Sequence, residues 1–458
     1  MIIIPRNILE IPKNGIARDE ILELLSGEMK VNDINPFKRK CFGLSYLIDE
    51  DHAEFVKSAF STFISENGLN PMAYPSLQSM ETEVVAMTAW MLNGNRKTTG
   101  TMTSGGTESI LNSIRAHRDW ALDTKGIDKP EMILPVTAHP AFEKGAHYFN
   151  LNVVHAPVRD DLRADVEKVA MMVNENTVLL VGSAPCYPYG VIDPIEELAQ
   201  IAAENNIGCH VDSCLGGFFL PWVEKAGYPL YCKWDFRVPG ITSISADLHK
   251  YGYAAKPASV ILYKNDDLRK YQFYVYPKWC GGIYGSPSMP GTRPGGAIAA
   301  AWATLKSIGQ EGYIKYCQEV MDTTKKMCDG INAIDGLHVM GKPDMSIFSY
   351  TFDDDLHLDF YKFIDLVALK GEWFINRMQD PPAAHHNICR LHAPIVDEFL
   401  SDLKWALKKL KSMPSTEEIK GQAAMYGMVG TIDKTEEIET LVRDILLSEY
   451  SYNPKRKK

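Results

Sequence analysis

One lysine in this sequence stands where it could do covalent chemistry, at the end of a predicted buried strand. The apolar run 241–246 is followed four residues later by Lys250, and a second lysine, Lys256, lies six positions beyond it. Burial lowers the pKa of an amine, which frees its lone pair to form a Schiff base with a carbonyl compound. The alternative is a strand-end lysine that points into solvent, as most lysines do. Lys250 alone does not decide between the two.

A glycine-rich turn is a candidate phosphate site. Residues 104–109 read Ser-Gly-Gly-Thr-Glu-Ser and connect a strand predicted at 99–104 to a helix predicted at 107–123. Glycine allows the backbone to approach a ligand closely, and the free N–H groups at the start of a helix attract anions. A purely structural turn is the alternative, because such turns are common.

Two other predicted strand ends carry groups that suit a pyridine ring. Asp212 follows the predicted strand at 207–211, and a carboxylate there could keep the ring nitrogen of a pyridoxal cofactor protonated. His139 follows the predicted strand at 132–136, where its imidazole could stack on the ring, with a core histidine as the alternative. Because active sites of such sheets lie beyond the carboxyl ends of the strands, we expect these groups to meet Lys250 there.

A metal site is a competing interpretation of the same region. Four candidate ligands are close in sequence: Cys209, His210, Asp212 and Cys214. The last three alternate onto one face of a strand, which would suit coordination. The sequence contains no second cluster of ligands to support such a site, so we predict no metal.

The elements that must position these groups alternate between strands and helices. Strands are predicted at 99–104, 132–136, 153–158, 178–182, 207–211, 241–246 and 259–263. Helices are predicted between them at 107–123, 141–149, 162–173 and 195–205. Single helices between strands imply right-handed crossovers and a mostly parallel sheet that is covered on both faces. We therefore predict an α/β fold.

Three regions are predicted along the chain: an N-terminal arm at 1–75, a large domain at 76–309 and a smaller α/β domain at 310–458. Helices outside the large sheet are predicted at 50–65, 297–308, 311–334 and 395–411, and strands near 346–352 and 386–391. The Gly/Pro-rich segment 281–296 contains Ile283, Tyr284 and Arg293 and follows Trp279, which favours an ordered functional loop over disorder.

The composition excludes some classes of function. The 458 residues carry 48 Lys and Arg against 58 Asp and Glu, a net charge of −10, which argues against a nucleic-acid-binding surface. Nine cysteines without a Cys-x-x-Cys pair favour reduced thiols in a cytoplasmic protein. We predict no signal peptide and no transmembrane segment, because no apolar run approaches about 18 residues.

Taken together, these motifs resemble the pyridoxal-phosphate enzymes of fold type I, in the group II decarboxylase superfamily, and most of all the sphingosine-1-phosphate lyases. The turn at 103–109 is typical of the whole superfamily. Segments more typical of the lyases lie at 187–194, 210–218, 245–253 and 279–296. The resemblance is strong over about residues 40–310 and implies a large domain with a mostly parallel seven-stranded sheet and a smaller C-terminal α/β domain.

The resemblance also implies pyridoxal 5'-phosphate as the cofactor and a role for each matched residue. Lys250 would hold the cofactor covalently, Asp212 would pair with its ring nitrogen, and His139 would stack on the ring. Further cofactor-binding residues would be Gly106, Thr107, Ser183, His249 and, from the neighbouring subunit of a homodimer with shared active sites, Thr292. Residues that would contact the substrate are Tyr46, Asn70, Tyr187, Lys256 and Tyr426, and Tyr46 and Tyr187 would also be catalytic.

Two features differ from the family pattern. Asn70 stands where the family has a histidine in the pocket for the substrate's own phosphate, so it offers a hydrogen bond without a charge. Lys256 is then the one charged residue assigned to that phosphate. We also expect no N-terminal membrane helix of the kind that the eukaryotic lyases carry.

The implied reaction is carbon–carbon cleavage of a phosphorylated long-chain 2-amino-3-hydroxy base into an aldehyde and phosphoethanolamine. The base that removes the 3-hydroxyl proton could be Tyr187, Lys250 or the substrate phosphate. The alternative is a group II α-decarboxylase of an amino acid, which uses the same electron sink on a different bond. A non-catalytic relative is a third interpretation, and the intact Lys250 and Asp212 argue against it.

Overall fold

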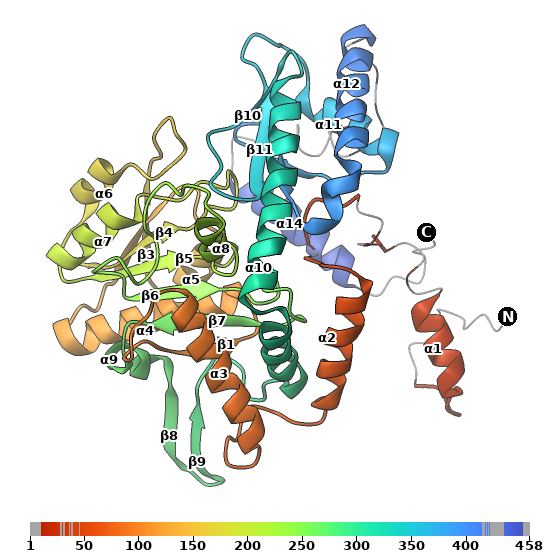
Figure 1. Ribbon diagram of the computed structural model, residues 1–458. Helices are drawn as coiled ribbons and strands as arrows, with labels where there is room; N and C mark the ends of the chain where they lie inside the picture. Colours follow the sequence, from red (N-terminus) through yellow and green to blue (C-terminus); the bar gives the residue numbers. More distant parts are fainter. Residues whose placement is uncertain are drawn as a thin grey trace.

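The computed structural model describes residues 11–27, 30, 33–35, 37, 40–44, 46–414, 417, 419, 421 and 435–451. A seven-stranded sheet lies at the centre of the molecule, and a smaller sheet lies beside it (Figure 1). Tyr426, which was predicted to contact the substrate, is outside the described residues.

The large sheet confirms the predicted α/β class. Its strands are β1 (Thr99–Thr103), β2 (Glu131–Pro135), β3 (Asn152–Ala156), β4 (Thr177–Ser183), β5 (Gly208–Asp212), β6 (Ser243–Ala246) and β7 (Ser259–Tyr263). They lie in the order β1-β7-β6-β5-β4-β2-β3. β7 runs antiparallel to β1 and β6, and the other neighbouring pairs are parallel. β4 and β5 bury every residue, as expected for central strands that are covered on both faces.

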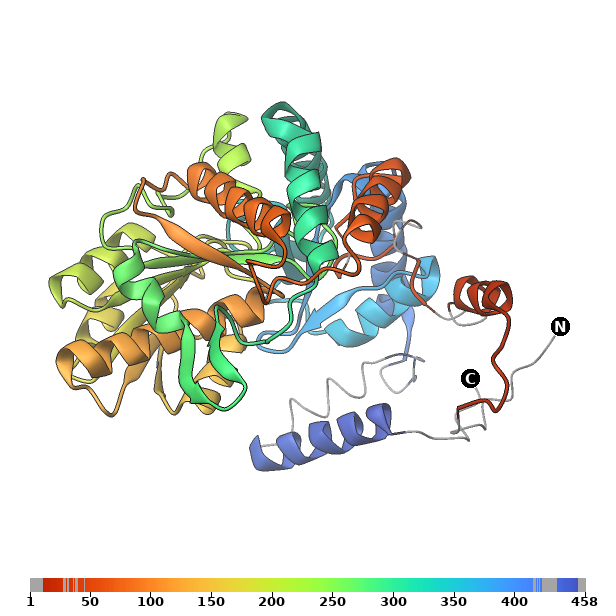
Figure 2. The ribbon, with the colours of Figure 1, turned by 90° about the horizontal axis from the view of Figure 1, so that it is seen from below.

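Helices cover both faces of this sheet. They are α3 (Pro75–Met91), α4 (Gly106–Lys125), α5 (Ala141–Phe149), α6 (Val166–Met172), α7 (Ile195–Glu204) and α8 (Leu220–Lys225). α4 and α5 share one apolar cluster with the sheet, whereas α3, α7 and α8 belong to the cluster on its other face (Figure 2). α4 begins directly after β1, so its N-terminus lies at the carboxyl edge of the sheet.

The helix predicted at 162–173 is shorter in the structure. Leu162 has a left-handed backbone (φ 66°) in a turn where the Arg159 N–H donates to the Arg163 carbonyl (2.8 Å). α6 therefore begins only at Val166, after Asp165 caps it by accepting from the Lys168 N–H.

A four-stranded antiparallel sheet forms the centre of the C-terminal part. Its strands are β10 (Leu337–Val339), β11 (Ile347–Phe352), β12 (Asn376–Met378) and β13 (Ala383–Asn387), in the order β10-β11-β13-β12. α11 (Phe360–Gly371) and α12 (Val396–Ser412) pack on each other beside it. The strand predicted at 386–391 lies a few residues earlier, at β13, and the three-residue strands β10 and β12 were not predicted.

A long helix, α10 (Gly295–Asn332), leads from the large sheet into this part. It replaces the two helices predicted at 297–308 and 311–334. Gly309 has a non-helical backbone (φ 62°, ψ 176°) and marks a kink close to the predicted domain boundary.

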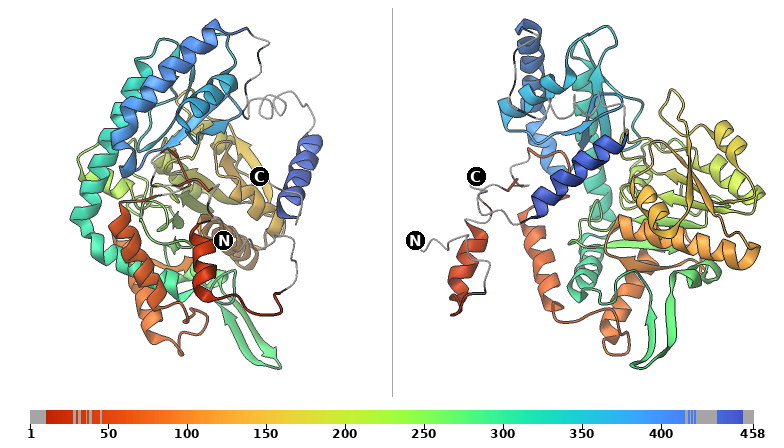
Figure 3. Two further views of the ribbon diagram at one scale, coloured as in Figure 1. Left: turned by 90° about the vertical axis from the view of Figure 1, so that its right-hand side faces the viewer. Right: turned by 180° about the vertical axis from the view of Figure 1, so that it is seen from behind.

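A β-hairpin projects from the body of the molecule (Figures 1 and 3). It consists of β8 (Tyr274–Trp279) and β9 (Gly282–Ser286), and the short helices α9 (Asp266–Arg269) and η3 (Lys270–Gln272) precede it. Its exposed apolar side chains are Tyr274, Val275, Tyr276, Trp279 and Ile283. The segment 281–296 was predicted to be an ordered loop, but its first part is strand β9 and its last residues begin α10.

The remaining helices lie outside the two sheets. They are α1 (Arg18–Ser26), α2 (Glu50–Thr62), η4 (Arg390–Ile395) and α14 (Thr435–Tyr450). α2 packs against α10, whereas Figure 3 shows α1 and α14 at the periphery. In the part of the chain that the structure describes, no helix has both the length and the apolar character needed to cross a membrane.

A tight turn between β4 and α7 packs closely against the small sheet. Gly190 has a left-handed backbone (φ 69°), and a Cβ built on it would lie 1.9 Å from the backbone oxygen of Ile347 in β11. Gly227 has a similar backbone (φ 88°), but a Cβ there would meet no described atom within 4 Å. The two glycines therefore differ in their surroundings and not in their backbone conformation.

We predict that Gly190→Ala destabilises the protein more than Gly227→Ala. Both substitutions add the cost of a left-handed alanine, about 1–2 kcal/mol. Gly190→Ala also forces a backbone clash, for a total of about 2–5 kcal/mol. Thermal unfolding of the two variants checks this, and equal losses would contradict the close contact between the turn and β11.

Candidate active site

The carboxyl ends of the strands surround a cavity of about 320 Å³. The residues that line it are Ser104, Gly105, Gly106, Thr107, Glu108, Ile110, His139, Asp212, Cys214, Asp247, His249 and Lys250. Six predicted cofactor-binding residues thus lie around one cavity: Gly106, Thr107, His139, Asp212, His249 and Lys250. They come from the ends of β1, β2, β5 and β6, as the topology requires.

The N-terminus of α4 forms one wall of this cavity. The N-cap residue of α4 is Gly105, which has no side chain that could cap the N–H groups of the first turn. Glu108 Oε2 accepts from the Ser104 N–H (2.7 Å), which lies before the helix. Free N–H groups and the positive end of the helix therefore face the cavity and suit an anion. A Cβ on Gly106 would lie 2.6 Å from Cys214 Sγ and 2.9 Å from Asp247 Oδ2, so the turn needs glycine here.

Lys250 forms an ion pair with a carboxylate that sequence reasoning did not assign. Its Nζ lies 3.0 Å from Oδ2 of Asp247, whose side chain is 1% exposed. Burial is the largest single influence and lowers the pKa of Lys250, but the charges of Asp247, Cys214 and Tyr46 and the hydrogen bond to Asp247 together outweigh it, so the pKa is raised above its ordinary value. The expectation that burial leaves this amine with a lowered pKa was therefore wrong. The sequence feature that could have revealed this ion pair is the spacing of three positions between Asp247 and Lys250.

Two histidines beside the cavity are neutral because of burial. The Ala141 N–H donates to Nδ1 of His139 (3.1 Å), and the Ala258 N–H donates to Nδ1 of His249 (3.1 Å). Each ring therefore carries its proton on Nε2. Burial lowers the pKa of both, although nearby carboxylates partly oppose it.

Asp212 presents a nearly buried carboxylate, 7% exposed, at the end of β5. Its Oδ1 accepts from the Cys214 N–H (3.1 Å) and the Ser245 hydroxyl (3.4 Å). Ser183, predicted to bind the cofactor, is the register partner of Asp212 on β4 but does not line the cavity. Its hydroxyl is buried without a hydrogen-bond partner among the described residues.

A second cavity, of about 290 Å³, adjoins the first at His249. Tyr46 and Lys256, both predicted to contact the substrate, line it. Burial raises the pKa of Tyr46, and Lys250 opposes that rise. Lys256 donates to the Leu44 carbonyl (2.6 Å), and burial, followed by the charge of Lys250, lowers its pKa. The two predicted substrate residues are thus brought together next to the Lys250 cavity.

Tyr187 is held over the site by a histidine of the small sheet. Its ring stacks on His385 (centroids 4.1 Å apart) and meets His139 edge-on (6.4 Å). Nε2–H of His385 donates to the Tyr187 carbonyl (2.7 Å). Sequence reasoning missed His385, because nothing in the local sequence around it indicates a contact with a residue almost two hundred positions away.

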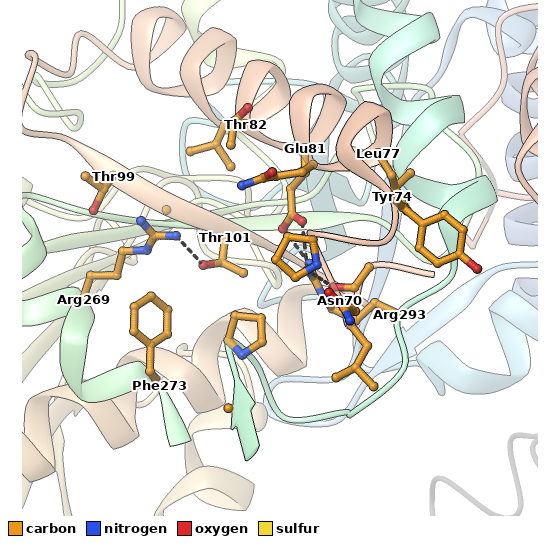
Figure 4. Close-up of a pocket in the computed structure, with 18 of the residues that line it drawn as sticks. Asn70, Tyr74, Leu77, Glu81, Thr82, Thr99, Thr101, Arg269, Phe273 and Arg293 are labelled. Atoms are coloured by element: carbon orange, nitrogen blue, oxygen red, sulfur yellow. Dashed lines mark hydrogen bonds and ion pairs between the residues drawn. The ribbon is translucent and has the colours of Figure 1, made fainter. Parts of the chain in front are cut away.

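Asn70 lies elsewhere. It lines a larger cavity, of about 520 Å³, between α3, β1 and the segment that precedes the hairpin (Figure 4). Arg293 closes one side of this cavity, with Nη1 bonded to Glu81 (2.5 Å) and Nη2 bonded to the Gly68 carbonyl (2.7 Å). Neither Lys250 nor Lys256 lines it, so one chain does not bring Asn70 and Lys256 together. Thr292 is exposed and lines none of these three cavities.

The first cavity fits pyridoxal 5'-phosphate. The N–H groups of α4 suit a phosphate, Asp212 suits a protonated ring nitrogen, and the amine of Lys250 suits the aldehyde. Asp247 Oδ1 is buried without a hydrogen-bond partner among the described residues, which is expected where a polar ligand completes the site. No group of three or more metal-ligating side chains is found within the described part of the chain.

The chain is similar to known proteins over nearly its whole length. Residues 46–352 match the model of the pyridoxal-dependent decarboxylase conserved domain. The sphingosine-1-phosphate lyase of Oryza sativa subsp. japonica is 41% identical over 96% of this chain and 80% of its own length. The structure of a Burkholderia pseudomallei sphingosine-1-phosphate lyase has a TM-score of 0.88 at 36% identity and covers 97% of this chain and 98% of its own.

A glutamate decarboxylase of Lactobacillus brevis shares the fold alone, with a TM-score of 0.76 at 20% identity over 88% of this chain and 95% of its own. The cofactor of these enzymes is pyridoxal phosphate, for which the strand-end cavity has the fitting groups. The chain therefore belongs to the pyridoxal-dependent decarboxylase family and, within it, to the sphingosine-1-phosphate lyases.

Proposed function

We propose that this enzyme cleaves the C2–C3 bond of a phosphorylated long-chain 2-amino-3-hydroxy base by retro-aldol chemistry, releasing an aldehyde and phosphoethanolamine. The observation that carries the proposal is a second lysine, Lys256, in a cavity that adjoins the Lys250 cavity and also contains Tyr46. A cation at this place suits the phosphate of a substrate whose amine reaches Lys250. The kinship with sphingosine-1-phosphate lyases supports the same substrate class.

Each residue of the first cavity is proposed to bind a different part of the cofactor. Lys250 would hold it covalently, Gly106 and Thr107 would receive its phosphate, Asp212 would pair with the ring nitrogen, and His139 would stack on the ring. His249 lines the same cavity, and Ser183 is the register partner of Asp212 on β4. When bound, pyridoxal phosphate supplies an electron sink for the bond that breaks next to the substrate nitrogen.

Proton transfer follows from the pKa shifts around the cavity. Burial raises the pKa of Tyr187 and of Tyr46, so both are hydrogen-bond donors at neutral pH and not bases. The pKa of Lys250 is also raised, because Asp247 lies beside it, so its released amine holds a proton that it can deliver to C2. The substrate's phosphate then remains as the base for the 3-hydroxyl proton.

A second candidate function is α-decarboxylation of an amino acid, supported by the match to the decarboxylase domain model and by the shared fold of a glutamate decarboxylase. It would use the same electron sink on the bond to a carboxylate. A decarboxylase of that kind has no need for Lys256, so this residue separates the two functions.

We predict that Lys256→Ala lowers kcat/KM for a phosphorylated long-chain base about tenfold to a hundredfold. A charge-assisted hydrogen bond contributes roughly 1.5–3 kcal/mol, and 1.4 kcal/mol corresponds to a factor of ten. The absorbance of the bound cofactor should not change, because Lys250 is intact. Lys264→Ala, at an exposed lysine after β7, is the matched control and should keep full activity. Unchanged cleavage by Lys256→Ala would favour decarboxylation instead.

The enzyme works, in this proposal, as a homodimer with shared active sites. Two observations support it: Asn70 and Thr292 lie away from the cavities of Lys250 and Lys256, and the β8–β9 hairpin exposes five apolar side chains. A second copy would cover the hairpin and supply both residues to the site.

We predict that a heterodimer of Lys250→Ala and Thr292→Trp subunits keeps about half of the wild-type activity, since one of its two sites is free of both changes. Each homodimer should be inactive. The matched control is a heterodimer of Lys250→Ala and Asp212→Ala subunits, which should stay inactive because both residues belong to the site of their own chain. Purification through two different tags followed by an activity assay gives the answer. A fully active monomer would refute the shared site.

A cytoplasmic location completes the proposal. All nine cysteines are free thiols, and eight of them are buried or half-buried, which suits a reducing compartment. Fractionation of cells that make the protein tests this, and recovery with the membranes would contradict it.

A further inference from the structure

A chain of hydrogen bonds runs from Asp212 into the interior of the molecule beneath α4. Asp212 and His210 lie on one face of β5, opposite their register partners Ser245 and Ser243 on β6. All four side chains are buried, and the last three are fully inaccessible to solvent. α4 packs on β5 and β6, and Asp212 lines the cofactor cavity at one end of this polar stripe.

The distances define the links of the chain. Ser245 Oγ lies 3.4 Å from Asp212 Oδ1 and 3.3 Å from His210 Nε2. On the other side of the ring, His210 Nδ1 lies 2.8 Å from Ser243 Oγ and 3.0 Å from Ser113 Oγ of α4. His210 thus contacts hydroxyl groups through both ring nitrogens, which leaves neither nitrogen for the metal site that its position in the sequence suggested.

The direction of the chain follows from the acceptor at its end. An ionised carboxylate can only accept, so the single hydroxyl proton of Ser245 points to Asp212. Ser245 then accepts from Nε2–H of His210, and Nδ1 accepts from Ser243 or Ser113. Burial, with a smaller contribution from His117, lowers the pKa of His210 to about 3, which agrees with a neutral ring that has one proton to place.

We propose that His210 is a positioning residue for the cofactor, which acts through Ser245 to fix one oxygen of Asp212 and leave the other for the ring nitrogen. Oδ1 is fixed by Ser245 and the Cys214 N–H, and no donor among the described residues contacts Oδ2. Oδ2 is therefore the oxygen left for the ring nitrogen. Hydrogen bonds to the charged form of a carboxylate favour that form, which a protonated ring nitrogen requires. The inference rests on the proposed role of Asp212.

The variant that tests it is His210→Leu, and the chain offers a matched control. His117 lies in α4 itself and is also buried, its nitrogens bond the Ser113 carbonyl and the Thr242 hydroxyl (both 2.8 Å), and it does not contact Asp212. His117→Leu removes a buried imidazole of the same kind. His210→Gln keeps an N–H donor for Ser245, and Ser245→Ala breaks the chain at its middle link with a smaller change of volume.

Two measurements distinguish positioning from stability: the dissociation constant of pyridoxal phosphate, and the 15N chemical shift of the ring nitrogen in holoenzyme made with labelled cofactor. We expect His210→Leu and Ser245→Ala to raise the dissociation constant about tenfold and to move the ring nitrogen toward the unprotonated form. His117→Leu should lower the thermal midpoint but change neither quantity. His210→Gln should restore the nitrogen shift.

An unchanged nitrogen shift in both His210→Leu and Ser245→Ala would overturn the inference, because His210 would then be structural. Asp212→Asn shows which hypothesis has failed. If Asp212→Asn moves the nitrogen shift while the other two variants do not, Asp212 keeps its proposed role and only the inference about His210 is wrong. If Asp212→Asn also leaves the shift unchanged, the proposed role of Asp212 itself is wrong.

Discussion

The ion pair between Asp247 and Lys250 is the interaction on which the rest of the site depends, because it places two opposite charges 3.0 Å apart in the interior. Taking such charges out of water costs several kcal/mol for each, which only a close partner offsets. Loss of either residue would leave the other without its partner in a cavity that Asp212, Cys214 and His249 also line. The pair also determines the chemistry of the lysine, since an amine beside a buried carboxylate holds its proton firmly.

The second sheet and the segments beside it hold residues next to the site. Tyr251, next to Lys250, donates its hydroxyl proton to the Ile388 carbonyl (2.9 Å) and accepts from the Ser346 hydroxyl (2.7 Å). His385 holds Tyr187 by stacking and by a hydrogen bond to its carbonyl. A buried ion pair between Arg163 and Asp344 (2.9 Å) joins the same two parts of the chain. The residues over the cavity therefore depend on contacts between segments that lie far apart in sequence.

Much of the large sheet could be predicted from local patterns. The strand at 259–263 and the helix at 141–149 have the predicted bounds, because apolar periodicity and flanking turn residues identify them without tertiary information. The predicted start of a helix at residue 162 was wrong, because Leu162 has a left-handed backbone and the helix begins only at Val166. Strands of three residues, such as β10 and β12, are too short to leave a periodic signal.

The same distinction applies to the site. Lys250, Asp212 and His139 could be grouped from the sequence, because each follows a strand of one parallel sheet. The raised pKa of Lys250 could not be predicted, because it depends on whether Asp247 and the other groups around the amine together outweigh burial, and this requires their geometry. The separation of Asn70 from Lys256 also became visible only in three dimensions.

In the proposed reaction, Lys250 and Lys256 together direct cleavage to a carbon–carbon bond of a phosphorylated amine. The most direct measurement is mass spectrometry of the products after incubation of the holoenzyme with sphingosine 1-phosphate and, separately, with a panel of free amino acids. We expect a long-chain aldehyde and phosphoethanolamine in the first case and no carbon dioxide in the second. Carbon dioxide from an amino acid, with no aldehyde from the phosphorylated base, would contradict it.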